Sequence, residues 1–382
     1  MHSTNGGQAR RVLFIVNSLR YGGAEKHVVS LLNHLDTQTF RLSLAYLKPE
    51  NDLLPQISSE RLESIRYVNA VGKFGGGAVR RLATQIDASD IDVVVCTNMY
   101  SMLYGVLASR LSKRRPRVME VFHSTLIQGL KYKLHMAFYW PIFRMCDLLV
   151  YVCENQRGYW RAKGLRAAAD AVVYNGIDVN HFSSILSVEE KIQLRRQYGI
   201  EPSDYLIGIC AALRPEKAHG DLIAAVARLR LAGVAAKCLF VGEGVERANL
   251  ERHIAALNLQ DHVKITGFQA DVRPLIAICD VMTLVSHSET FSISALESMA
   301  LGKPMVMSRI GGADEQVQPG INGYLFEAGD IDQLTATLAK LADVRESRAM
   351  GERASAIVAE KFSLNSMVTR FAALLSDEAV KA

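Results

Sequence analysis

Short apolar runs alternate with longer amphipathic segments along nearly the whole chain of 382 residues. The apolar run at 11–18 is typical of a buried strand, whereas the segment 26–35 repeats apolar residues every three or four positions, which predicts a helix. The same pattern predicts strands at 41–48, 92–98, 117–123, 148–153, 205–213, 237–244, 263–268, 281–286, 304–308 and 323–327. In the second half it predicts helices at 187–199, 219–232, 246–257, 271–279, 292–301 and 331–343.

Two successive strand–helix series of similar length predict an α/β protein with two Rossmann-like, doubly wound parallel-sheet domains. The first domain is expected at 1–180 and the second at 181–364. The segment 365–382 follows the second series and predicts a final helix, which could return to the first domain. No short repeat is visible, so a solenoid is not expected.

The composition is that of a globular protein, with 49% hydrophobic and 22% charged residues, and the pattern of cysteines predicts a cytoplasmic one. The first apolar run is too short for a secretory signal, and the most apolar long stretch is broken by Pro141, Arg144 and Asp147. The six cysteines lie mostly in strand-like apolar runs without a C-x-x-C pair, which favours reduced core residues. No nucleic-acid partner is expected.

Positive charge is concentrated in the first half of the chain, where residues 1–180 hold 23 Lys or Arg and 14 Asp or Glu. Basic clusters occur at 110–117 and 131–133, and the second runs directly into the aromatic, apolar segment 134–143. A cationic face beside exposed aromatic residues suits an anionic membrane surface. The alternative is a solvated helix end followed by a helix of the core.

A glycine turn follows the first predicted strand, in the stretch YGGAE at 21–25. Gly22 and Gly23 would let the backbone approach a bound group, and the helix that follows would attract negative charge to its N-terminus. The stretch lacks the G-x-G-x-x-G spacing, so a nicotinamide dinucleotide is not supported. A plain tight turn is the alternative.

Cations and glycines recur at strand ends in the second domain. Arg214 and Lys217, three positions apart in a loop that leads into a helix, could neutralise the charge of a leaving diphosphate. Gly242 lies in a second glycine turn, and Gly267 with Phe268 ends a strand in a way that suits a base ring. Taken alone, each of these stretches could equally be a solvated loop.

Two glutamates eight positions apart, Glu289 and Glu297, flank the start of a predicted helix. The amides of Phe291, Ser292 and Ile293 would be unpaired donors at that helix N-terminus and could cradle a phosphate. Glu297 could accept hydrogen bonds from a ribose diol, while Glu289 could face the next group of the ligand. The apolar stripe of this helix predicts that Glu297 does not point straight into the core. Alternatively, both glutamates are ordinary surface residues.

The motifs AEKH, VFHS, NGID, LRPEK, VGEGVE, TGF, the Glu289/Glu297 pair, GKPMV and NGYLFEAGD occur in this order along the chain. Together they resemble the retaining glycosyltransferases of family 4, which have the GT-B fold. The resemblance covers nearly the whole sequence. It implies that a sugar nucleotide binds between two Rossmann-like domains, mainly to the C-terminal one.

The resemblance also implies a role for each candidate residue. Glu297 would bind the ribose, Glu289 would face the donor sugar, and His123 in VFHS would lie beside the transferred sugar. Lys217, Arg214 and the amides of 291–293 would bind the diphosphate, and Gly267 and Phe268 would lie near the base. Gly23 and Gly242 would let the backbone approach the ligand closely. Many family members carry an arginine two positions before Arg214, where this chain has alanine, so Arg214 is expected to take over that role.

By the same resemblance, the protein transfers a sugar from a UDP-linked donor, or a GDP-linked one as second choice, with retention at the anomeric carbon. The acceptor would be a hydroxyl of a glycan or lipid-linked molecule in cell-surface polysaccharide synthesis, at the inner face of the membrane. No cofactor and no essential metal are expected, because no D-x-D lies between a strand and a loop. Two alternatives remain open: a sugar-nucleotide 2-epimerase, and a non-catalytic scaffold that binds nucleotide sugars.

Overall fold

The computed structural model describes residues 9–70, 75–124, 129–183 and 186–376. The chain divides into two compact units, which are taken separately below. The first unit comprises Met1–Asn175 together with Asn365–Ala382, and the second comprises Gly176–Leu364. The division therefore falls between Asn175 and Gly176 rather than between 180 and 181, and the last helix belongs to the first unit.

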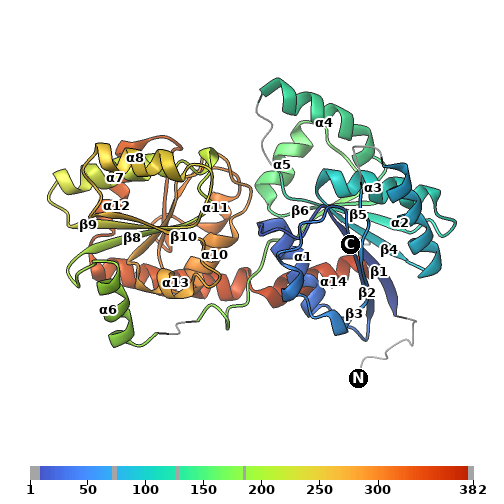
Figure 1. The fold of residues 1–382 in the computed structure, drawn as a ribbon, viewed down its shortest axis with the longest axis horizontal. Coiled ribbons are helices and arrows are strands. Elements are labelled where there is room, and N and C mark those ends of the chain that lie inside the picture. Colours follow the sequence, from blue (N-terminus) through green and yellow to red (C-terminus); the bar gives the residue numbers. More distant parts are fainter. Residues whose placement is uncertain (1–8, 71–74, 125–128, 184–185, 377–382) are drawn as a thin grey trace. The chain divides into compact units, whose positions relative to one another are not determined.

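The described part of the first unit contains a seven-stranded parallel sheet in the order β3-β2-β1-β4-β5-β6-β7. Its strands are β1 (Arg10–Val16), β2 (Phe40–Tyr46), β3 (Leu62–Tyr67), β4 (Val93–Thr97), β5 (Arg117–Phe122), β6 (Leu148–Tyr151) and β7 (Ala169–Val172). Its helices are α1 (Gly23–His34), α2 (Gly76–Ala88), α3 (Asn98–Leu111), α4 (Gly129–Phe143), α5 (Glu154–Ala162) and α14 (Leu364–Leu375). Helices cover both faces of the sheet (Figure 1).

The sequence pattern missed β3 and β7, which are the two edge strands of this sheet. An edge strand has only one neighbour, and most residues of these two are partly exposed. They therefore lack the continuous apolar run that marks a strand buried on both faces. The five strands between them are the five that the pattern predicted.

Helix α14 packs on the first sheet although it is the last element of the chain. The ring of Phe371 stacks on Phe14 of β1, with ring centroids 6.3 Å apart. Arg10 and Arg117, at the start of β1 and β5, donate hydrogen bonds of 2.7 and 2.8 Å to the carbonyl oxygens of Leu375 and Leu374. Two cations thus satisfy carbonyls at the C-terminal end of the helix, where the helix dipole also favours positive charge.

Within the described residues, the second unit contains a six-stranded parallel sheet in the order β10-β9-β8-β11-β12-β13. Its strands are β8 (Tyr205–Cys210), β9 (Ala236–Val241), β10 (Val263–Gly267), β11 (Val281–Leu284), β12 (Met305–Ser308) and β13 (Gly323–Phe326). Its helices are α6 (Val188–Gln197), α7 (His219–Leu231), α8 (Arg247–Ala256), α9 (Arg273–Ile278), α10 (Ile293–Ala300), α11 (Ala313–Gln316), α12 (Ile331–Lys340) and α13 (Val344–Lys361). All six predicted strands of this half are confirmed, and the pattern missed α11 and α13.

Helices α7, α8 and α12 cover one face of the second sheet, while α10 and α13 lie together on the other (Figure 1). Doubly wound parallel sheets in both units confirm the predicted α/β, Rossmann-like architecture. All six cysteines are free and buried, as expected for reduced core residues.

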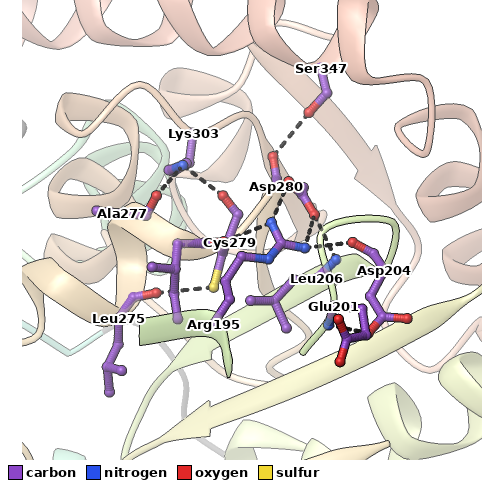
Figure 2. A network of polar contacts seen from close by, with 11 residues as sticks. Arg195, Glu201, Asp204, Leu206, Leu275, Ala277, Cys279, Asp280, Lys303 and Ser347 are labelled. Atoms are coloured by element: carbon purple, nitrogen blue, oxygen red, sulfur yellow. Dashed lines mark hydrogen bonds and ion pairs between the residues drawn. The ribbon is translucent and has the colours of Figure 1, made fainter. Parts of the chain in front are cut away.

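A polar network ties together the amino-terminal edge of the second sheet (Figure 2). The Asp280 carboxylate accepts hydrogen bonds from the Leu206 amide (2.7 Å) and from Arg195 (3.3 Å), and its backbone carbonyl accepts one from Ser347 (2.9 Å). Lys303, in the GKPMV motif, donates hydrogen bonds to the carbonyl oxygens of Ala277 (2.8 Å) and Cys279 (2.6 Å) beside the end of α9. Burial lowers the pKa of Lys303. This motif residue therefore has a structural role, at the sheet edge where α/β proteins do not bind their ligands.

Candidate functional site

The carboxyl-terminal edge of the second sheet has a topological switch point between β8 and β11. The chain proceeds from β8 outward to β9 and β10, and then from β11 outward to β12 and β13 in the opposite direction. The loops that follow β8 and β11 therefore diverge and leave a crevice between them, which is where open α/β sheets bind ligands. Both the LRPEK stretch and the Glu289 loop leave the sheet at this point.

Three contacts join the loop after β11 to the loop after β8 and to the first turn of α7, which follows it. The His287 amide donates a hydrogen bond to the Glu216 carbonyl oxygen (2.8 Å), and His287 Nε2 lies 2.9 Å from Asp221 Oδ2. Lys217 Nζ donates to Glu289 Oε2 at 2.6 Å, and both side chains are more than three-quarters shielded from solvent. Two candidates that were predicted from separate motifs thus form one ion pair at the switch point.

Arg214 does not join this pair. It precedes a short 3₁₀ turn, Pro215–Lys217, and its side chain is 61% exposed. The carboxylate nearest to its guanidinium is Glu216, at 3.9 Å. The expected phosphate role of Arg214 therefore stays a prediction.

Helix α10 carries Glu297, which is only 5% exposed. The helix is buried on every side from Ala295 to Met299, so the burial of Glu297 does not place its side chain on the apolar stripe, and the expectation that it does not point straight into the core stays a prediction. A buried carboxylate is costly unless it is hydrogen-bonded or paired. Glu297 is therefore not an ordinary surface glutamate.

The N-terminus of α10 is already partly satisfied by protein groups. The Ser292 amide donates to Gln316 Oε1 (3.1 Å), and Gln316 Nε2 donates back to the Ser292 carbonyl (2.8 Å). The Ser292 hydroxyl accepts from the Ala295 amide and caps the helix. The prediction of an unpaired amide at Ser292 is therefore wrong, since Gln316 already accepts its hydrogen bond. The Phe291 ring itself is buried against Phe362, with centroids 5.4 Å apart.

The remaining glycine candidates of the second unit lie at the ends of β9 and β10. A Cβ atom on Gly242 would overlap the carbonyl oxygen of Ala211, so this glycine allows two loops to pack backbone against backbone. Gly267 has a φ of +77°, and Phe268 beside it is 55% exposed. The Glu243–Arg247 ion pair (2.6 Å) borders Gly267. Phe268 is thus an exposed aromatic residue at the end of β10, whereas Gly242 has a packing role.

In the first unit, the candidates lie at the carboxyl edge near the switch point between β1 and β4. Gly23 is the first residue of α1 and follows Gly22 at the N-cap. His123 follows β5, and its amide donates to Asn98 Oδ1 (3.2 Å). The His123 ring lies 5.2 Å from the ring of His27, a residue of the AEKH motif that sequence reasoning did not single out.

Both of these histidines are neutral at physiological pH. Burial lowers the pKa of His27 to about 4, against a smaller opposing effect of its hydrogen bond with Asn175 (3.0 Å). Burial, followed by the proximity of His27, holds the pKa of His123 well below its usual range. A neutral His123 can act as a hydrogen-bonding group or as a weak base, whereas a protonated His123 could not accept a proton.

Comparison with known proteins identifies the chain. Residues 21–181 match the family model of Glycosyltransferase Family 4, and residues 190–356 match that of Glycosyl transferases group 1. The chain belongs to glycosyltransferase family 4. This confirms the family that the ordered motifs indicated.

Two relatives of this family 4 chain have different names and match different shares of its length. N-acetyl-alpha-D-glucosaminyl L-malate synthase of Bacillus anthracis is 34% identical over 54% of the chain and 53% of that relative. The putative glycosyltransferase EpsD of Bacillus subtilis is 28% identical over 66% of the chain and 67% of its own length. The first alignment thus spans about half of the relative.

The GT-B fold is confirmed by solved structures. Anabaena Alr3699/HepE in complex with UDP superposes with a TM-score of 0.85 at 22% identity, covering 96% of this chain and all of that one. The same protein in complex with UDP-glucose has a TM-score of 0.81.

No group of three or more His, Cys, Asp or Glu residues in the described part of this family 4 chain is arranged to hold a metal ion. None of the helices that could be searched there has the length and apolar character needed to cross a bilayer.

The glycine turn after β12 supports the Glu289 loop and offers a direct test. Gly311 has a φ of +54°, and a Cβ atom there would overlap the Glu289 carbonyl oxygen and lie 2.7 Å from that of Thr290. We expect Gly311→Ala to lose about 2–4 kcal/mol of stability, from left-handed strain and from the clash. Because the clash displaces the loop that holds Glu289, ligand binding at this edge should weaken as well.

Gly320→Ala is the matched control for this prediction. Gly320 has a φ of +79° and no atom within 4 Å of its ideal Cβ, so it carries the backbone strain without the clash. Urea unfolding of the two variants separates the two costs. Equal losses of stability would mean that the contact between Gly311 and the Glu289 loop has no energetic weight.

Proposed function

We propose that this protein is a retaining glycosyltransferase that moves a sugar from a UDP-linked donor to a hydroxyl of a glycan or lipid-linked acceptor, in cell-surface polysaccharide synthesis. The observation that carries the proposal is the Lys217–Glu289 pair at the switch point of a family 4 chain. The choice of UDP rests on the likeness to Anabaena HepE, which was crystallised with UDP and with UDP-glucose. The acceptor class rests on the resemblance and on the basic first unit.

The chemistry asks chiefly for stabilisation of the leaving diphosphate, which departs on the face that the acceptor attacks. A lysine ammonium has three N–H donors, and Lys217 uses one of them on Glu289. It can therefore keep Glu289 in place and still donate to a phosphate oxygen. Such a preorganised cation in a shielded position stabilises the negative charge that develops as the diphosphate leaves.

Glu289 and Glu297 take different parts in this proposal. Glu289, held by Lys217 and by the Gly311 turn, faces the donor sugar. Glu297, which is buried in α10, accepts hydrogen bonds from the ribose diol. The roles of His123, Gly23 and Arg214 rest on the family resemblance alone, as does the expectation that no metal is needed.

Calorimetry and thermal unfolding with UDP, GDP, ADP and their common sugars test the donor site. We expect one nucleotide class to stabilise the wild type by about 2.7 kcal/mol at a concentration of 100 Kd. Glu297→Ala should bind that nucleotide about 10- to 100-fold more weakly, because hydrogen bonds to a charged acceptor contribute about 1.5–3 kcal/mol.

The control is Glu352→Ala, which removes an exposed glutamate from α13 of the same unit and should bind like the wild type. Stabilisation by no nucleotide would refute the donor-site assignment, and an unchanged Kd in Glu297→Ala would remove the ribose role. Incubation of the nucleotide sugar without acceptor then separates transferase from 2-epimerase. An epimer identifies the second, and only slow hydrolysis is expected of the first.

A further inference from the structure

A groove of about 390 Å³ opens between α2 and α3 of the first unit. It is lined by Gly76, Val79 and Arg80 from α2 and by Leu103, Tyr104, Leu107 and Leu111 from α3. Its size falls within the range of small-molecule sites, and its lining is mostly apolar. No candidate residue of the proposed donor site takes part in it.

The groove continues onto an apolar outer surface. Leu107 and Leu111, one helical turn apart on α3, are 39% and 57% exposed. Leu134 and Phe138 repeat this spacing on α4, which contacts α3, and are 64% and 44% exposed. Exposed apolar residues at helical spacing, as on the α3 side of the groove, indicate a surface that is covered in use.

Positive charge lies beside the groove. The segment 76–117 holds seven Lys or Arg and three Asp, a net charge of +4. Arg80 is exposed in the groove wall, and Arg110 is exposed one residue before Leu111. Within the described part of the chain, neither guanidinium forms a hydrogen bond or an ion pair. Both are therefore available to an anionic ligand.

The structure also corrects which cations of the basic cluster at 110–117 are available. Arg114 is paired with Asp92 (2.8 Å) and lies 3.7 Å from Asp90. Arg117 donates to the Leu374 carbonyl of α14. These two arginines stabilise the first unit, and the side chains of the second basic cluster, 131–133, lie outside the described residues.

We propose that the groove between α2 and α3 receives an acyl chain of an anionic phospholipid at a bilayer surface, with Arg80 and Arg110 facing the phosphate group. An apolar chain fits this lining because the tyrosine hydroxyl there is already engaged: Tyr104 accepts a hydrogen bond from the Gly75 amide (3.2 Å) and lies 3.3 Å from the Tyr100 hydroxyl. The two rim cations complement a headgroup phosphate. The groove thereby holds the first unit on the membrane that presents a lipid-linked acceptor. Binding of the lipid is independent of the proposed function, and only the link to such an acceptor rests on it.

Sedimentation with vesicles tests the proposal, using phosphatidylcholine alone and phosphatidylcholine with phosphatidylglycerol. We expect the wild type to bind the mixed vesicles and not the neutral ones. Arg80→Gln with Arg110→Gln should weaken binding about 30-fold, since each basic residue near an anionic surface contributes about 1 kcal/mol. Leu107→Ser with Leu111→Ser, both at exposed positions, should weaken it at least about tenfold.

Filling the groove separates chain insertion from surface attraction. Val79→Phe keeps every charge and both exposed leucines, so it should lower binding only if a chain enters the groove. The matched control, Leu231→Ser with Arg348→Gln, removes one exposed leucine and one exposed arginine from the second unit and should bind like the wild type.

Unchanged binding in Val79→Phe and in the leucine variant would overturn the acyl site and leave electrostatic adsorption alone. Absence of binding to the mixed vesicles would overturn the proposal altogether. Circular dichroism and thermal unfolding confirm that each variant is folded. Nucleotide binding, measured on the same preparations, depends on the second unit, so failure of this proposal is distinguishable from failure of the proposed function.

Discussion

Lys217→Ala is expected to lower kcat/KM for sugar transfer by about 10²- to 10³-fold, which is the loss found when one preorganised donor to a developing negative charge is removed. The side chain donates to Glu289 at 2.6 Å and is 21% exposed, so it is held in a shielded position before the donor binds. Its removal should affect kcat more than nucleotide affinity, because the diphosphate gains charge as the sugar leaves. The assay is transfer, or slow hydrolysis, of the sugar nucleotide that stabilises the wild type.

Lys237→Ala is the matched control for this variant. Lys237 forms an ion pair with Asp204 at 3.0 Å, and its side chain is 16% exposed, so it resembles Lys217 in burial and pairing. It lies near the start of β9, at the opposite edge of the same sheet. Each substitution leaves a shielded carboxylate without its partner, so both variants should lose a similar amount of stability, about 1–3 kcal/mol. Activity near that of the wild type in Lys217→Ala, or an equal loss in both variants, would refute the assignment.

The architecture could be predicted because buried parallel strands are recognisable in the sequence as apolar runs. Nine of the eleven strands that the pattern predicted lie inside the two sheets, and the other two, β10 and β13, are edge strands of the second sheet. Both strands that the pattern missed, β3 and β7, also lie at an edge, where the apolar signal is weaker. The helix α13 was missed because it is largely polar and follows a segment that the pattern had already assigned to a helix. Local patterns thus suffice for elements that are buried along their whole length.

The candidate site could be predicted only in part. Each of Lys217 and Glu289 carries a local signal, but their contact spans 72 positions and depends on β8 lying next to β11, which no local pattern records. The engagement of the Ser292 amide by Gln316 is equally non-local. Lys303 shows the converse case, since a residue in a motif typical of the family holds carbonyl groups away from the switch point.

Buried histidines in the first unit predict a pH dependence of stability that a single substitution can isolate. Unfolded His27 takes up a proton near its ordinary pKa of about 6.5, whereas burial lowers the pKa of the folded residue to about 4. Between these two values the unfolded state binds more protons, so stability falls as the pH falls. Over this window His27 should account for a loss of about 3 kcal/mol.

His27→Gln removes this titration. The variant should be less stable than the wild type at pH 7, because the packing and the hydrogen bond to Asn175 change, but the difference should shrink by up to about 3 kcal/mol as the pH falls to 4. Both tryptophans of the chain, Trp140 and Trp160, lie in the first unit. Their fluorescence in urea titrations at several pH values therefore reports on this unit selectively.

A comparison at each pH is needed because a second buried group acts with the opposite sign. Burial raises the pKa of the Glu120 carboxyl well above its usual range, so the folded state retains a proton there and gains stability as the pH falls. Glu120 is present in both proteins and cancels in the difference. His34→Gln, which changes an exposed histidine of the same helix α1, should leave the wild-type curve unaltered. Parallel curves for the wild type and His27→Gln would show that His27 titrates alike in the folded and unfolded states, and that its burial is not held in solution.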